Sequence, residues 1–230
     1  MNNYDELYRI IDYRFNDEDL LKKALTHSSY AAECKIGYEN NNERLEFIGD
    51  AYVDAVVGMK LFEIMGKAHE GMLSRRRADV VCEASLADTA VYMGLGEFIL
   101  LGKGEDASGG RSKPSILSDT FEALMGAIFI DGGYETVSRV ILRLLGDKIQ
   151  AAAEGKLSSD FKTKLQEYLQ NKDHNVKIEY KVVDESGPDH MKEFTVAALA
   201  NGVALGIGSG ASKAKAEQAA AENALSKGVE

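Results

Sequence analysis

Apolar side chains in the first two thirds of the chain recur every three or four residues, a spacing that places them on one face of a helix. Asn16 can cap a helix over LLKKAL, and a long helix is predicted from about Glu43 to Met65. Further helices are predicted over MLSRRRADVV, ASLADTAVYMG, PSILSDTFEALMGAIFI and ETVSRVILRLL. Residues 1–153 are therefore predicted to form an all-α domain.

A polar, glycine-rich segment, GKGEDASGGRSKPS, interrupts the helical pattern between Gly102 and Ser115. Pro114 fits the first position of the helix that follows. The segment is similar to a phosphate-binding P-loop, but Gly110 stands where that motif requires lysine. We interpret it as a connecting loop and expect no nucleotide cofactor.

The periodicity changes after residues 154–159, a short polar segment with the composition of a linker. Residues 160–228 are predicted to form a small domain of order α-β-β-β-α. Its signals are a helical DFKTKLQEYLQ, alternation at Val176, Ile178, Tyr180 and Val182, then at Phe194, Val196 and Ala198, then at Val203, Leu205 and Ile207, and an alanine-rich helix from about Ser212 to Ala224. Asn201-Gly202 is typical of a type I′ hairpin between the last two strands. The fold class is therefore a multidomain α+β protein.

Composition places the chain among ordinary globular proteins, with 45% hydrophobic and 28% charged residues. We predict no membrane span and no export signal. Two cysteines, Cys34 and Cys82, are too few for a disulfide framework and indicate a reducing cytoplasm; we interpret both as buried apolar residues. The net charge of -10 excludes a uniformly basic nucleic-acid protein, so contacts to nucleic acid must come from local clusters.

Acidic residues lie on two of the predicted helices. In NNERLEFIGDA, Glu43, Glu46 and Asp50 share one stripe of the long helix, where a solvated acidic face is the ordinary meaning. Asp119 and Glu122, however, lie on a helix apolar enough to be core. If the two helices pack together, these acids converge, and unit charges about 4 Å apart repel by roughly 4 kcal/mol at an effective dielectric near 20. Divalent cations would relieve that repulsion, and an all-oxygen set favours Mg²⁺ or Mn²⁺ over zinc.

The segments NERLEFIGDA and KPSILSDTFEALMGAIFIDGG together resemble the paired signature of the ribonuclease III family, and the order of elements matches its bacterial members with a single catalytic domain. The resemblance implies an endonuclease that acts as a homodimer and hydrolyses both strands of double-stranded RNA with Mg²⁺. It implies products with 5′-phosphate and 3′-hydroxyl ends and short 3′ overhangs, in the processing of ribosomal RNA precursors and messenger RNAs. The alternative is a regulator that binds double-stranded RNA without cleaving it, but such relatives typically lack the acids.

Transferred by motif position, the resemblance assigns roles to particular residues. The catalytic, metal-binding acids would be Glu46, Asp50, Asp119 and Glu122, with Glu43 and Glu70 as auxiliary acids. Glu70 is equally explained as a helix-start acid stabilised by the helix dipole. Phe47 would lie at the dimer interface, the alternative being the core of its own chain. His27, in LTHSSYA, is interpreted as structural.

The C-terminal region resembles a double-stranded RNA-binding domain in TKLQEYLQ, GPDH and GSGASKAKAEQAAAENAL. That resemblance implies contacts to RNA minor grooves from Thr163, Gln166, Glu167, Gln170 and His190, and to phosphates from Ser212, Lys213 and Lys215. Ala214 stands where the family usually has a basic residue, so we expect weaker RNA binding and a salt slope lower by about one. Arg75, Arg76, Arg77, Arg111 and Lys113 are either solvated charges or further RNA contacts.

Overall fold

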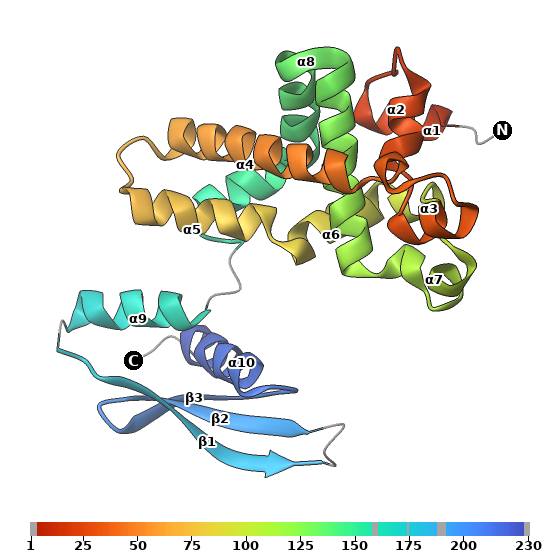
Figure 1. Ribbon diagram of the computed structural model, residues 1–230. Coiled ribbons are helices and arrows are strands. Elements are labelled where there is room, and N and C mark those ends of the chain that lie inside the picture. The colour runs from red at the N-terminus through yellow and green to blue at the C-terminus, as the bar shows by residue number, and fades with distance from the viewer. Residues whose placement is uncertain (1–3, 158–160, 174, 188–191, 228–230) are drawn as a thin grey trace. The chain divides into compact units, whose positions relative to one another are not determined.

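Two sets of elements follow one another along the chain, the first helical and the second mixed (Figure 1). The computed structural model describes residues 4–157, 161–173, 175–187 and 192–227. Its contacts divide the chain into Met1–Leu157, here the helical unit, and Ser158–Glu230, here the mixed unit.

The helical unit contains eight α-helices among its described residues: α1 (Asp5–Ile11), α2 (Glu18–Ala24), α3 (Ser28–Cys34), α4 (Glu43–Met65), α5 (Glu70–Val81), α6 (Glu83–Tyr92), α7 (Lys103–Ala107) and α8 (Pro114–Ala153). Helix α4 crosses α8 at the centre, and α5 runs back alongside α4 (Figure 1). Val57 and Leu61 of α4 are fully buried, as are Phe121 and Leu124 of α8. The long apolar helices therefore form the core, and the predicted all-α region is confirmed.

Helix α8 joins two segments that the sequence pattern predicts as separate helices. The chain turns within it at Gly133, whose φ of 78° is a left-handed conformation that favours glycine. Just before this turn, the Asp131 carboxylate accepts hydrogen bonds from the Tyr13 hydroxyl at 2.5 Å and from the backbone N–H groups of Asn16 at 2.8 Å and Asp17 at 3.0 Å. The start of α2 is thereby fixed to the bend in α8.

The N-cap of α2 is Asp17, and the prediction of Asn16 is wrong by one residue. The Asp17 side chain accepts a hydrogen bond from the N–H of Asp19. The backbone of Asn16 is instead held by Asp131 from a distant helix, a contact that local sequence does not encode.

The glycine-rich segment is more ordered than the connecting loop that its composition predicts. It contains α7 and a 3₁₀ turn at Gly110–Ser112. The guanidinium of Arg111 donates to the carbonyls of Gly96 at 3.0 Å and Ile99 at 2.9 Å, which fixes the segment to the preceding chain.

The interpretation of the two cysteines as buried residues is wrong. Cys34 and Cys82 are both exposed and unbonded to each other. Cys34 is the last residue of α3, and Cys82 lies between α5 and α6, so both stand at helix ends rather than on inward faces.

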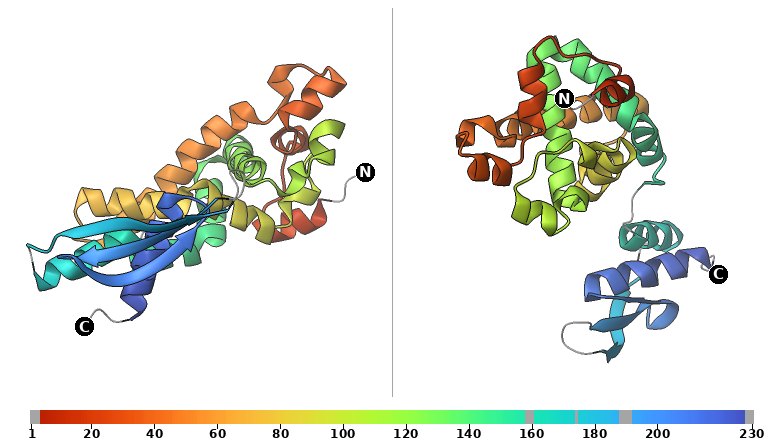
Figure 2. Two further views of the ribbon diagram at one scale, coloured as in Figure 1. Left: turned by 90° about the horizontal axis from the view of Figure 1, so that it is seen from below. Right: turned by 90° about the vertical axis from the view of Figure 1, so that its right-hand side faces the viewer.

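The mixed unit has the predicted order: α9 (Phe161–Lys172), β1 (Ile178–Ser186), β2 (Glu193–Ala200), β3 (Val203–Gly210) and α10 (Lys213–Ser226). The strands form an antiparallel sheet of order β1-β2-β3, and both helices cover the same face of it (Figure 2). Asn201 and Gly202 both have positive φ, 49° and 84°, as the predicted two-residue hairpin requires. Within the described ranges, none of the helices of either unit has the length and apolar content that crossing a bilayer requires.

Two glycines of β3, Gly206 and Gly208, face helix α10 directly. A Cβ built at Gly206 would stand 2.4 Å from the carbonyl oxygen of Ala220, and one at Gly208 would stand 2.2 Å from the nitrogen of Ala220. Val203 and Ile207, which contribute to the alternation that predicts the strand, are exposed. Backbone-to-backbone packing against an alanine face therefore brings α10 close to the sheet.

Candidate active site

Helices α4 and α8 approach each other with almost no side chain between them. A Cβ built at Gly49 would stand 1.7 Å from the carbonyl oxygen of Glu122. One built at Gly126 would stand 2.1 Å from the carbonyl oxygen of Leu45. Only glycine fits at either position, and the close approach brings the residues one turn before each glycine toward the opposite helix.

Three of the predicted acids meet at this crossing. Glu46 of α4 and Asp119 and Glu122 of α8 each offer a carboxylate oxygen, and these three oxygens lie within 4.8 Å of one another. All three side chains are partly buried. We call these residues the acidic cluster.

Asp50, the fourth predicted acid, is exposed and lies outside the set of oxygens within 4.8 Å. It nevertheless acts on Glu122: among the charged neighbours of Glu122, Asp50 makes the largest contribution to the rise in the pKa of that carboxyl. The structure therefore brings three acids together and leaves Asp50 at the edge of the cluster.

Burial and mutual repulsion disfavour the charged forms of these acids. Burial is the main cause that raises the pKa of Glu122 to about 8, and the carboxylates of Asp50, Asp119 and Glu46 raise it further. Burial followed by Asp119 also raises the pKa of Glu46. A cation bound among the three oxygens would remove this cost, and hard carboxylate oxygens without histidine or cysteine suit Mg²⁺ or Mn²⁺.

Asp119 has an additional partner on its own helix. Burial raises its pKa, and a hydrogen bond from the Ser118 hydroxyl at 3.3 Å acts in the opposite direction. Glu83, at the start of α6, raises the pKa of Asp119 further. A negative charge on a third helix, α6, thus also raises the pKa of a cluster residue.

The two proposed auxiliary acids lie at helix starts. Glu43 is the first residue of α4, is exposed, and contributes to the raised pKa of Glu46. Glu70 is the first residue of α5, and its carboxylate accepts a hydrogen bond from the Ser74 hydroxyl at 2.7 Å. Neither belongs to the acidic cluster, and the position of Glu70 fits the helix-start interpretation.

Phe47 follows Glu46 on α4 and points away from the core of its own chain. Its side chain is 77% exposed. An aromatic side chain so exposed beside an acidic cluster is available to a partner surface. His27, in contrast, is used within its chain: its Nδ1 accepts a hydrogen bond from the N–H of Ser29 and caps α3.

The predicted RNA-contacting residues of the mixed unit lie mostly on two helices. Leu165 and Leu169 bury one face of α9, and the opposite face carries Thr163, Gln166, Glu167 and Gln170. Ser212 caps α10, its hydroxyl accepting from the N–H of Lys215 at 3.3 Å, and Lys213 and Lys215 are exposed in the first turn of that helix. His190 lies outside the described residues.

Four of the five basic residues of the helical unit that were considered as RNA contacts have acidic partners. Arg76 pairs with Asp79 at 3.3 Å and Arg77 with Asp54 at 3.6 Å. Arg111 pairs with Asp106 at 2.8 Å, and Lys113 with Glu105 at 2.6 Å. These ion pairs within the chain explain much of the grouping of basic residues without any contact to RNA.

Comparison with known proteins decides the family. Residues 17–149 match the family model described as ribonuclease-III-like. This chain belongs to the ribonuclease III family. Residues 161–227 match the double-stranded RNA binding motif, so the resemblance stated from the sequence is confirmed in both regions.

Individual relatives agree with this membership. Ribonuclease 3 of Caldanaerobacter subterraneus subsp. tengcongensis is 48% identical over 217 residues, 94% of each chain. The crystal structure of the nuclease domain of ribonuclease III from Campylobacter jejuni is 45% identical, with a TM-score of 0.59, and covers 64% of this chain and 96% of that one. A second structure of that nuclease domain, 44% identical with a TM-score of 0.59 over 64% and 98% of the two chains, is described as flexible in a region involved in dimer formation.

Membership makes this chain an endoribonuclease that acts on double-stranded RNA. It also indicates a requirement for a divalent cation, which the acidic cluster fits. Sequence reasoning missed Gly49 and Gly126, the residues that allow the cluster to form. Their signal was a glycine within each apolar helix, next to or one turn after an acid.

Proposed function

We propose that the chain hydrolyses both strands of double-stranded RNA with Mg²⁺, for which Mn²⁺ can substitute, and acts as a homodimer. The products carry 5′-phosphate and 3′-hydroxyl ends with short 3′ overhangs. The observation that supports this most directly is the cluster of Glu46, Asp119 and Glu122, whose oxygens lie within 4.8 Å in a chain that also carries an RNA-binding motif. A regulator that only binds RNA has no need of three mutually repelling acids.

In this proposal Glu46, Asp50, Asp119 and Glu122 hold the cation, with Glu43 and Glu70 as outer acids. When bound, the cation supplies Lewis-acid stabilisation of charge on the phosphate and lowers the pKa of water. The carboxylates must be ionised to bind it, so Glu122 releases a proton as its pKa falls from about 8. The close crossing of α4 and α8 fixes the positions of these carboxylates relative to one another, so that the cation they hold would face the phosphodiester.

Dimerisation would use Phe47, which is 77% exposed on α4. The description of dimer formation for the Campylobacter jejuni nuclease domain supports an interface in this family. Two copies of the acidic cluster would then be available, one for each RNA strand.

RNA binding would use Thr163, Gln166, Glu167 and Gln170 on α9, His190, and Ser212, Lys213 and Lys215 at the start of α10. The exposed face of α9 presents hydrogen-bonding groups, and the α10 lysines provide the charge that phosphates require. We propose ribosomal RNA precursors and messenger RNAs as substrates, in the cytoplasm. The exposed thiols of Cys34 and Cys82 suit a reducing compartment.

Metal dependence gives the primary test. A long RNA duplex incubated with the protein and Mg²⁺ is expected to be cut to short duplexes on a native gel, and EDTA is expected to prevent the cutting. The fragments should be substrates for a 5′-phosphate-dependent exonuclease, because water attacks phosphorus with loss of the 3′-oxygen. Intact RNA at every concentration of Mg²⁺ and Mn²⁺ would refute the proposal.

Removal of residues 154–230 separates dimerisation, proposed for the helical unit, from RNA binding, proposed for the mixed unit. We expect the truncated protein to remain a folded dimer, because the core of the helical unit lies within its own helices and a nuclease domain alone forms a solved structure. Its affinity for duplex RNA should fall by about tenfold or more, since the phosphate contacts of α10 are lost. Sedimentation and filter binding measure the two quantities, and a monomer would contradict the Phe47 interface.

A further inference from the structure

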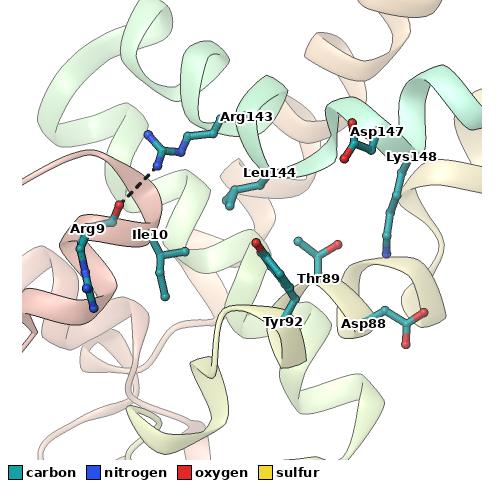
Figure 3. Close-up of a pocket in the computed structure, with 9 residues that line it drawn as sticks. All are labelled: Arg9, Ile10, Asp88, Thr89, Tyr92, Arg143, Leu144, Asp147 and Lys148. Atoms are coloured by element: carbon teal, nitrogen blue, oxygen red, sulfur yellow. Dashed lines mark hydrogen bonds between the residues drawn. The ribbon is translucent and has the colours of Figure 1, made fainter.

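A hollow in the helical unit lies apart from the acidic cluster. It has a volume of about 700 Å³, within the range of roughly 300–1,000 Å³ that is usual for small-molecule sites. Its walls come from α1, α6 and the part of α8 beyond the turn at Gly133 (Figure 3). None of the acidic cluster residues lines it, so the proposed cleavage chemistry does not account for it.

The middle of the hollow is aromatic and apolar. Tyr92, the last residue of α6, is 83% exposed and has no ring contact in the part of the chain that the structure describes. Ile10 and Leu144 lie on the facing walls, and the Tyr92 ring stands between the two ends of the hollow (Figure 3). An uncovered aromatic ring beside apolar side chains is suited to stacking with a flat ring.

One end of the hollow is cationic. Arg143 donates a hydrogen bond to the carbonyl of Arg9 at 3.4 Å and pairs with Asp12 at 3.2 Å. Arg9 pairs only loosely with Glu6, at 3.7 Å, and its side chain is 76% exposed. Exposed pairs of this kind contribute little, so a phosphate dianion can compete for the Arg143 guanidinium, while Arg9, whose side chain points away from Arg143 (Figure 3), adds positive charge to the same end.

The other end offers both donors and acceptors. Asp88 and Asp147 present carboxylate oxygens, and the Lys148 ammonium donates to the backbone carbonyl of Ser85 (Figure 3). Burial lowers the pKa of Lys148, and the carboxylate of Asp88 acts in the opposite direction. In the lining as a whole, cationic side chains outnumber carboxylates, although the chain has a net charge of -10.

We propose that this hollow binds a nucleoside monophosphate unit, with the base stacked on Tyr92, its polar edge toward Asp88 and Lys148, and its phosphate on Arg143. The unit has two sources, a free mononucleotide or the unpaired end of an RNA chain. Each feature of the ligand has a counterpart in the hollow: a flat ring, an edge with amino and carbonyl groups, and an anion.

Isothermal titration of the full chain with the four nucleoside 5′-monophosphates, with ribose 5-phosphate and with inorganic phosphate tests the stacking. We expect saturable binding of at least one nucleoside monophosphate. Tyr92→Ala should weaken that binding by about tenfold or more, because base stacking on an aromatic side chain is lost, whereas Tyr92→Phe should retain it. Val91→Ala is the matched control, since Val91 is also exposed on α6 but does not line the hollow.

Binding of duplex RNA in EDTA distinguishes the two sources. If Tyr92→Ala weakens binding of a duplex with a single-stranded 3′ extension more than binding of a blunt duplex, the unpaired RNA end is the ligand. If the two duplexes are affected equally while a free monophosphate loses affinity, a free nucleotide is the ligand. Absence of saturable binding at millimolar monophosphate, or binding that inorganic phosphate matches and Tyr92→Ala leaves unchanged, overturns the proposal.

Discussion

Glu122→Gln is expected to lower Mg²⁺-dependent cleavage of a long RNA duplex by at least ~100-fold. Loss of a residue that only supports a metal ligand already costs a metal site up to about 100-fold, and Glu122 is proposed to hold the cation itself. The change keeps the size of the side chain and removes its charge. The loss should be large because Glu122 has the strongly raised pKa within the cluster, about 8, and its negative charge is therefore the one that the bound cation most clearly stabilises. A quantitative gel assay of initial rates over a range of Mg²⁺ concentrations measures the effect.

Duplex binding by the Glu122→Gln variant should remain close to that of the unmodified protein, because the predicted RNA contacts of the mixed unit are untouched. Glu135→Gln is the matched control: it makes the same chemical change at an exposed site on the same helix. Normal turnover by the Glu122 variant, or equal losses in both variants, would show that the acidic cluster does not hold the catalytic cation.

The same variant has a second expected readout in the metal-free protein. The pKa of Glu122 is raised from the usual 4.5 to about 8 by folding, so the folded state favours the protonated carboxyl. The corresponding stability is fully present below pH 4.5 and is lost as the pH rises through about 8. In EDTA, the melting temperature of Glu122→Gln should therefore fall less steeply with rising pH over that range than the melting temperature of the unmodified protein. Added Mg²⁺ should restore the stability of the unmodified protein alone.

Convergence of the acids could be predicted because one helix, α8, carries charged residues among apolar residues that the core requires. Asp119 and Glu122 lie among residues that must be buried, and burying two carboxylates is unfavourable unless something compensates. The same reasoning placed Asp50 inside the group, whereas it is exposed at the edge. Periodicity identifies a helical stripe, but the crossing point of two helices decides which members of the stripe face the partner helix.

Features that depend on distant contacts could not be predicted in this way. The turn at Gly133 lies beside Asp131, which is held by Tyr13 more than a hundred residues earlier. The hollow around Tyr92 likewise combines Arg9 with Arg143, residues that no local pattern connects. Sequence periodicity gives elements and faces, while these sites arise only from the packing of α1, α2 and α6 against α8.

Gly49→Ala is expected to destabilise the helical unit by about 3 kcal/mol or more, the upper range for overpacking a well-packed site. The added methyl would stand 1.7 Å from the carbonyl oxygen of Glu122 and 2.5 Å from its carbon, and neither backbone atom can rotate away. Helices α4 and α8 must therefore separate. For a protein of this size, the loss corresponds to a fall of roughly 6–12 °C in the melting temperature of the helical unit, measured by calorimetry.

Gly146→Ala, on α8, supplies the matched control, because nothing lies within 4 Å of a Cβ built there and the same substitution should be neutral or stabilise by about 0.4–1 kcal/mol. Separation of the helices also moves Glu46 away from Glu122 and Asp119, so the Gly49 variant should need a higher Mg²⁺ concentration for half-maximal cleavage even at temperatures where it is folded. A Gly49→Ala protein with unchanged melting temperature and unchanged Mg²⁺ dependence would mean that the backbone contact between α4 and α8 does not position the acidic cluster.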